Sequence, residues 1–131
     1  MFAERLARDK RGAAAVEFAL VAPLFLLLAI GGMEVSIAIH KGSSVQYAIE
    51  KAARTAMITA SVDAAKFQEL VDENLDAMGV EADVDVAYST ETGPEIVLAR
   101  AQATYVHTVR PLLLPPFEVS FESDVSFPRA S

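Results

Sequence analysis

The sequence of 131 residues contains no cysteine and no tryptophan, and only two histidines. Without cysteine the chain forms no disulfide and offers no thiolate as a nucleophile or metal ligand. His40 and His107 have no second metal-ligating residue at a recognised spacing. The phosphate-binding loop, the dinucleotide-binding glycine motif, the nucleophile elbow and the zincin motif are also missing. We therefore expect no enzymatic activity, no metal site and no cofactor.

Basic residues are scarce after the first twelve positions. Residues 1–12 contain four Lys or Arg against two Asp or Glu, whereas residues 13–131 contain seven Lys or Arg against sixteen Asp or Glu. Because an acidic body repels phosphate, nucleic acid is not expected as a partner. A basic stub, an apolar run and then an acidic body follow the positive-inside rule for a cytoplasmic N-terminus and an exported C-terminal part.

One long run of the sequence carries no charge, and it begins at Phe18 and ends at Met33. As an α-helix these residues would span about 24 Å, slightly less than the hydrocarbon core of about 30 Å. Continuing the helix to Ile39 supplies the missing length. We therefore expect a transmembrane helix over residues 13–39, which makes the chain a single-pass membrane protein.

Glu17 lies at the entrance to this run, and three interpretations of the N-terminal residues treat it differently. A cleaved secretory signal would need a small-x-small site after the run, where SIAIHK offers a weak one, and a carboxylate fits poorly there. A plain signal anchor explains the charge asymmetry but not Glu17.

The third interpretation is cleavage after Gly12. Ala13 would then carry the new amino group, which is cationic near neutral pH, and Glu17 would be the fifth residue, on the same helical face. Glu17 could pair with this amine in its own chain or in a neighbouring subunit. Such a pair would offset much of the several kcal/mol that an unpaired carboxylate costs in hydrocarbon.

The segment RRGAAAVEFALVAPLFLLL resembles the processing site of type IV pilins and pseudopilins. More narrowly, it is similar to the start of TadE-like proteins, minor pseudopilins of the tight-adherence (Flp) pilus, and it fits the closely related TadF-like subunits as well. The resemblance implies that a prepilin peptidase reads Arg11 and cuts between Gly12 and Ala13 on the cytoplasmic side. It also implies that Glu17 is the assembly glutamate and Phe18 its aromatic companion.

After the membrane segment the sequence predicts two amphipathic helices. The first continues the membrane helix over residues 40–60, and Gly42, Ser43 and Ser44 are expected to loosen it just outside the membrane. Its apolar face is small-sided: Val45, Ala48, Ile49, Ala52, Ala53, Ala56 and Met57. We expect this stripe to pack within its own domain; packing on neighbouring helices in a filament is the alternative.

The second helix is predicted over residues 63–78, with Asp63 as the N-cap and Gly79 as the stop. One face is apolar, with Phe67, Leu70, Val71, Leu75 and Met78. The opposite face carries Glu69, Asp72, Glu73 and Asp76. Since no calcium-binding loop motif is present, a solvated acidic face is the preferred interpretation over cation binding.

Beyond Gly79 the hydrophobic period changes to two, which predicts three strands over residues 82–89, 95–109 and 117–127. A turn is expected at TETGP. The inward residues are Val84, Val86 and Tyr88; Val97, Ala99, Ala101, Ala103, Tyr105 and Val109; and Phe117, Val119, Phe121, Val125 and Phe127. The segment RPLLLPP is not expected to form a central strand, and its leucines Leu112, Leu113 and Leu114 are expected to be buried, with a surface that contacts membrane or another subunit as the alternative.

The expected fold is therefore an α+β, pilin-like domain in which a long N-terminal helix packs on a small antiparallel sheet. Residues 1–12 are a leader that is removed, residues 13–39 span the membrane and residues 40–131 form the exported domain. The resemblance implies a minor pseudopilin of the inner membrane that enters or serves an extracellular pilus used in adhesion. Its implied partners are the prepilin peptidase, other pilin subunits, the assembly machinery and the bilayer. The alternative is a signal-anchored binding module that never enters a filament.

Overall fold

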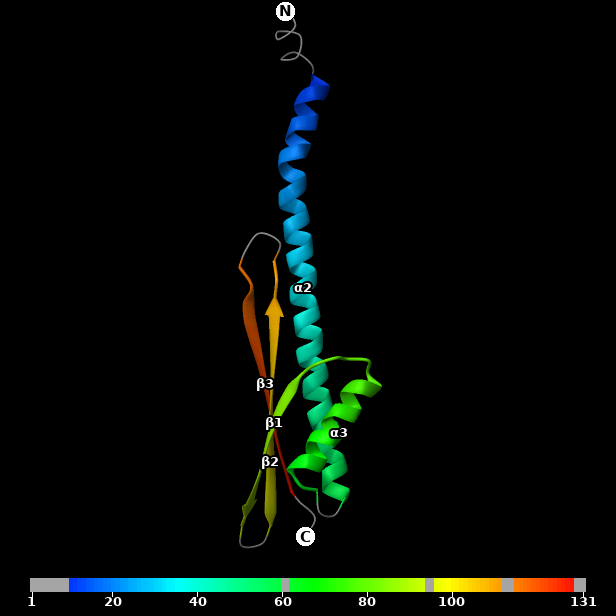
Figure 1. The fold of residues 1–131 in the computed structure, drawn as a ribbon, viewed down its shortest axis with the longest axis vertical. Helices are drawn as coiled ribbons and strands as arrows, with labels where there is room; N and C mark the ends of the chain where they lie inside the picture. Colours follow the sequence, from blue (N-terminus) through cyan, green and yellow to red (C-terminus); the bar gives the residue numbers. More distant parts are fainter. Residues whose placement is uncertain (1–9, 60–61, 94–95, 112–114, 129–131) are drawn as a thin grey trace, which may run out of the picture.

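The computed structural model describes residues 10–59, 62–93, 96–111 and 115–128 of the chain. A long helix and a short helix lie on one three-stranded antiparallel sheet (Figure 1), which confirms the expected α+β fold. The elements are α2 (Lys10–Ile58), α3 (Ala64–Ala77), β1 (Val84–Thr92), β2 (Val97–Val109) and β3 (Phe117–Pro128). The strand order is β1-β2-β3, so each strand pairs with its neighbour in sequence.

Helix α2 runs without interruption for 49 residues, or about 73 Å. It continues through Pro23 and through Gly42, so the expectation that the Gly-Ser-Ser segment loosens the helix is wrong. The hydroxyls of Ser43 and Ser44 donate to the carbonyl oxygens of the residues four positions earlier, at 3.0 Å each. These bonds satisfy the serine side chains locally and leave the backbone helical.

Helix α3 begins and ends where its sequence predicts. The side chain of Asp63 accepts the backbone N–H of Lys66 at 2.8 Å, which confirms it as the N-cap. At the other end Gly79 has φ +67°, and the N–H of Val80 donates to the carbonyl of Leu75 at 3.0 Å. This is a Schellman ending, and glycine suits it because the backbone enters the left-handed region.

The core lies between the outer part of α2, helix α3 and one face of the sheet. The face of α2 that contacts the sheet consists almost entirely of small residues. The facing side of β2 has three buried alanines, so the helix and the sheet approach each other closely. Fully or almost fully buried are Val45, Ala48, Ile49, Ala52, Ala53 and Ala56 of α2 and Ala99, Ala101 and Ala103 of β2. This confirms that the alanine stripe packs within its own domain.

Aromatic rings close the other side of this core. Phe67 of α3 lies with its ring centre 5.2 Å from that of Tyr88 on β1 and 5.8 Å from that of Phe127 on β3. Phe67 and Phe127 are 0% and 1% exposed, so one cluster joins α3 to both outer strands. The alternation predicted for the three strands therefore places its inward residues correctly in the centre of the sheet.

The prediction that apolar residues face the core is wrong at the ends of the elements. Met57, Met78 and Phe117 are 37%, 37% and 47% exposed. Met57 belongs to the last turn of α2, Met78 is the C-cap of α3 and Phe117 begins β3, so each lacks a neighbouring element on one side. The expected turn at TETGP also begins later, because β1 continues to Thr92, which pairs with Val97.

One end of the β2–β3 hairpin projects past the rest of the sheet. Strand β1 pairs only with residues 97–105 of β2, so residues 106–109 and 117–120 continue as a two-stranded ribbon beside α2 (Figure 1). Val109 in this ribbon is 2% exposed, and Ala38 of α2 is also 2% exposed. Leu112, Leu113 and Leu114 lie outside the described residues, so their burial stays a prediction.

Candidate functional site: the exposed segment of helix α2

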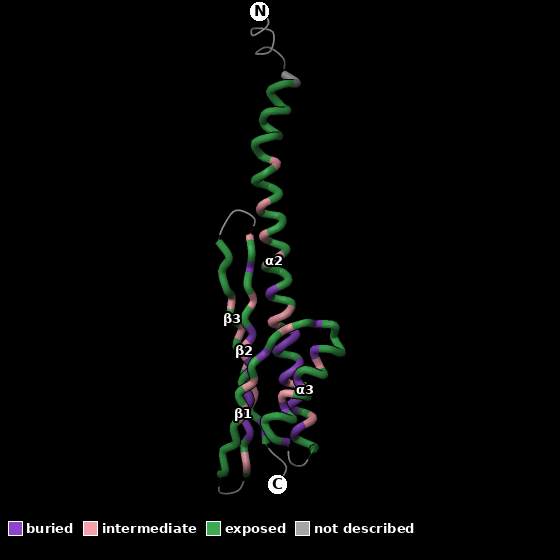
Figure 2. Tube along the Cα trace, viewed as in Figure 1, coloured by how far each residue is buried: buried purple, intermediate pink, exposed green. Residues whose placement is uncertain are grey.

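Helix α2 divides into two parts with opposite surroundings. We call residues 12–33 the exposed segment and residues 38–56 the packed segment. No residue of the exposed segment is buried, and Figure 2 shows it extending away from the domain as an almost uniformly exposed helix. Ala38 is the first buried residue among those whose side chains the structure describes.

The exposed segment is apolar on every side. Phe18, Leu20 and Leu28 are 74%, 74% and 69% exposed, and only three of its residues, Ala22, Leu27 and Gly31, reach intermediate burial. By length and composition α2 can cross a membrane. An aliphatic surface of this size is not stable in water, so it requires lipid or other apolar helices as its surroundings. The helix therefore indicates a membrane-anchored protein.

The predicted processing residues lie on the first turns of this helix. Arg11 is within α2, and Gly12 and Ala13 are both exposed, with no other described element beside them. A methyl group built on Gly12 would meet no atom within 4 Å. The backbone on both sides of the predicted cleavage point is therefore open to an approaching protein.

Glu17 lies one turn further along, exposed and on the same face of the helix as Ala13. Among the described residues it forms no salt bridge, and its aromatic neighbour Phe18 also contacts no other element. Side chains on a helix lean towards its N-terminus, so the carboxylate of Glu17 leans towards Ala13. Within the part of the chain that the structure describes, this carboxylate on an apolar helix therefore has no ion-pair partner.

Glu34 marks the end of the exposed segment and has a partner that the sequence did not reveal. Its Oε2 accepts the backbone N–H of Arg110 at 2.8 Å, which ties the end of β2 to the helix. The two residues are 76 positions apart, and no local pattern links them. The bond is charge-assisted, and it fixes where the sheet begins to cover the helix.

Gly42 is a second residue whose role sequence reasoning missed. A methyl group added there would lie 2.7 Å from Cδ1 of Phe121, a distance that carbon atoms do not adopt. The ring of Phe121 stacks on that of Tyr105 at a centre distance of 6.1 Å. Glycine therefore allows strand β3 to lie directly against the helix.

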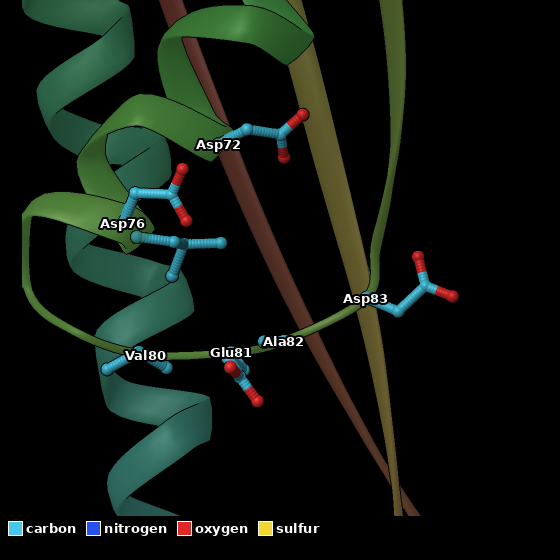
Figure 3. Close-up of a pocket in the computed structure, with 7 residues that line it drawn as sticks. Asp72, Asp76, Val80, Glu81, Ala82 and Asp83 are labelled. Atoms are coloured by element: carbon cyan, nitrogen blue, oxygen red, sulfur yellow. The ribbon is translucent and has the colours of Figure 1, made fainter.

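A concave region lies between the end of α3 and the start of β1. Its hollow of about 420 Å³ is lined by Asp72, Asp76, Glu81 and Asp83 together with Leu75, Val80 and Ala82 (Figure 3). The labelled carboxylates do not converge: Glu81 and Asp83 point away from Asp72 and Asp76. Among the described residues no three His, Cys, Asp or Glu side chains are grouped to hold a metal ion. This region is an acidic solvated surface.

The two histidines lie apart and have different surroundings. His40 is exposed on α2, whereas Nδ1 of His107 is 2.9 Å from the hydroxyl oxygen of Tyr105. Burial raises the pKa of Tyr105 above its usual value of 10.0, so its hydroxyl stays protonated at neutral pH. This pair lies on the helix-facing side of β2 and supports packing there.

The family model of TadE-like proteins matches residues 12–54. This segment of the chain is TadE-like. The match confirms the resemblance seen in the sequence and associates the protein with Tad pilus systems and their components. No curated protein and no solved structure matches the chain.

The TadE-like match lies entirely within helix α2. It starts at Gly12, includes the whole exposed segment and continues along the packed segment to Arg54. It contains Glu17, Phe18, Glu34 and Gly42, but neither α3 nor any strand. The similarity to TadE-like proteins is therefore carried by helix α2.

Proposed function

We propose that this chain is a non-enzymatic, TadE-like subunit that serves the assembly of a Tad pilus. Residues 13–39 would cross the inner membrane with the N-terminus in the cytoplasm and the α+β domain exported. A prepilin peptidase would remove residues 1–12 between Gly12 and Ala13. The observation that carries the proposal is Glu17, a carboxylate on the apolar exposed segment that no described part of the domain covers.

The physical reason begins with the cost of that carboxylate. An unpaired carboxylate in or near hydrocarbon costs several kcal/mol, and an ammonium group offsets much of this cost. Cleavage before Ala13 would create such a group on the same helical face, either in the same chain or in a neighbouring subunit. The start of a helix also stabilises negative charge.

The exposed segment is suited to assembly because its apolar side chains can exchange contacts with lipid for contacts with other helices. In the membrane its side chains contact lipid; in a bundle of pilin helices they would contact other helices. Association of helices in lipid depends on packing and polar pairs, since lipid chains are as apolar as leucine. A pair between Glu17 and an amine would therefore fix the axial register of neighbouring subunits.

Substitution of Glu17 tests this role directly. In Glu17→Ala the protein should still be processed and inserted, but its recovery in sheared pili or in complexes with other subunits should fall at least tenfold. Glu17→Gln keeps the size of the side chain without its charge and should fail to the same extent.

The matched control is Glu50→Ala, which removes a carboxylate from the outer part of the same helix. It should assemble as wild type does. If Glu17→Ala assembled like Glu50→Ala, the charge of Glu17 would have no part in assembly. The chain would then be better described as a membrane-tethered binding module.

A further inference from the structure

We infer that the end of the β2–β3 hairpin rests in the non-cytoplasmic leaflet of the membrane, at the boundary between headgroups and acyl chains. This inference rests on the proposed orientation of α2. We define the hairpin tip by its described residues Pro111, Pro115, Pro116 and Phe117. The proposed occupant of its apolar surface is lipid.

The position of Glu34 along α2 places it close to the outer edge of the proposed membrane span. A hydrocarbon core of about 30 Å requires about 20 helical residues, and more if the helix is tilted. Counted from Phe18, the core would extend at least to about Ile37, just past Glu34. The bond from the N–H of Arg110 to Glu34 therefore holds the end of β2 at the outer edge of the membrane.

The two-stranded ribbon extends towards the proposed membrane span. Strand β2 runs towards the N-terminal part of α2, and β3 begins with Phe117 opposite Val109, the last residue of β2 (Figure 1). The hairpin tip is thus at the level of Glu34 or closer to the membrane centre than it. No other described element reaches this level of the helix.

The chemistry of the tip suits this depth. Between Arg110 and Glu118 the sequence contains no residue whose side chain carries a charge or a hydrogen-bonding group. Pro115, Pro116 and Phe117 are all exposed. The three prolines have no backbone N–H, so this loop has fewer donors to satisfy away from water than an ordinary loop.

Charged residues limit how deep the tip can go. Arg110 and Glu118 are exposed at its two ends. The arginine can place its guanidinium among lipid phosphates while its aliphatic part remains apolar. Irregular backbone is not stable in the centre of a bilayer, so the tip would remain at the boundary.

The absence of cysteine allows a single-site test on the full chain. Phe117→Cys, labelled with an environment-sensitive fluorophore, is reconstituted in vesicles of phosphatidylethanolamine and phosphatidylglycerol. Lipids with a spin-label quencher close to the headgroup should quench it several-fold more than they quench the same label at Asp124→Cys. Asp124 is an exposed residue of the same strand, about 23 Å further from the tip.

The experiment also uses a second labelling site in the hairpin tip and a reference site in the proposed membrane span. Pro116→Cys lies outside the strands, so it does not depend on a residue of the sheet, and it should be quenched like Phe117→Cys. Leu26→Cys, in the exposed segment, should respond to quenchers placed deep in the acyl chains.

The Leu26→Cys variant distinguishes a wrong membrane span from a wrong lipid contact of the hairpin tip. If Leu26→Cys were not quenched, the proposed membrane span would be wrong. If Leu26→Cys were quenched but both tip sites behaved like Asp124→Cys, only the lipid contact of the tip would be wrong. Tip labels that report an apolar environment without lipid quenching would indicate a protein contact, which would also overturn the inference.

Discussion

The exposed and packed segments belong to one continuous helix but are stabilised by different surroundings. In the packed segment small residues recur every three or four positions and are completely covered by the sheet and α3. In the exposed segment large aliphatic and aromatic residues lie on all sides of the helix, and none of them is buried by the described parts of the chain. Identical substitutions on α2 should therefore have different consequences on the two sides of Glu34, and this can be measured.

The largest difference is expected between two isoleucines. Ile49 is 0% exposed and Ile30 is 41% exposed. Ile49→Ala should lower the free energy of unfolding of the domain by about 2–5 kcal/mol, because it leaves a cavity in the core. Ile30→Ala should leave it unchanged, since the side chain is exposed and no described element of the domain buries it.

Urea unfolding of the full chain in detergent micelles, followed by the near-ultraviolet circular dichroism of its tyrosines, measures both variants. Equal losses in the two variants would mean that the exposed segment contributes to the stability of the domain. The comparison between the two segments would then be wrong.

Two glycines provide a smaller contrast. Gly42→Ala places a methyl group against Phe121, whereas Gly31→Ala meets no atom within 4 Å. The crowding at Gly42 costs about 1–3 kcal/mol, and the higher helix propensity of alanine returns about 1 kcal/mol, so a net loss of about 1 kcal/mol is expected.

Gly31→Ala should show no loss in the same unfolding measurement. The double variant Gly42→Ala with Phe121→Leu should recover part of the loss caused by Gly42→Ala, because the smaller side chain makes room for the methyl group. Without such recovery, the close approach of Phe121 would not be the cause.

The smallest effect is expected at the border between the segments. Glu34→Gln removes the charge from the acceptor of the Arg110 N–H and should cost at most about 1 kcal/mol, because the pair is exposed. Hydrogen exchange is the more sensitive measurement: the amide of Arg110 should exchange several-fold faster, while amides in the centre of β2 remain unchanged. Glu50→Gln is the control, and equal exchange at Arg110 in both variants would show that Glu34 does not hold the ribbon.

Much of the fold follows from local patterns in the sequence. The 3.6-residue and two-residue periods, the Asp63 cap and the Gly79 stop predict both helices and all three strands, because each signal depends on residues close in sequence. The misplaced residues Met57, Met78 and Phe117 lie at element ends. Burial there depends on whether another element extends far enough to cover them, which periodicity does not encode.

The candidate site was predictable for a different reason. The RRG sequence, Glu17 and the apolar run all lie within one segment, so their spacing was visible directly. The bond between Glu34 and Arg110 and the contact of Gly42 with Phe121 join the helix to strands far along the chain. Both depend on the position of strands β2 and β3 along the helix, and a single sequence does not contain that information.

The central claim is that the exposed segment becomes the N-terminal part of a processed, assembling subunit. The most direct test is the intact mass of the protein purified from cells with and without the prepilin peptidase. We predict that the peptidase-containing cells yield a chain that begins at Ala13, and that the peptidase-deficient cells yield one that retains residues 1–12. Retention of Met1 in both would contradict the claim.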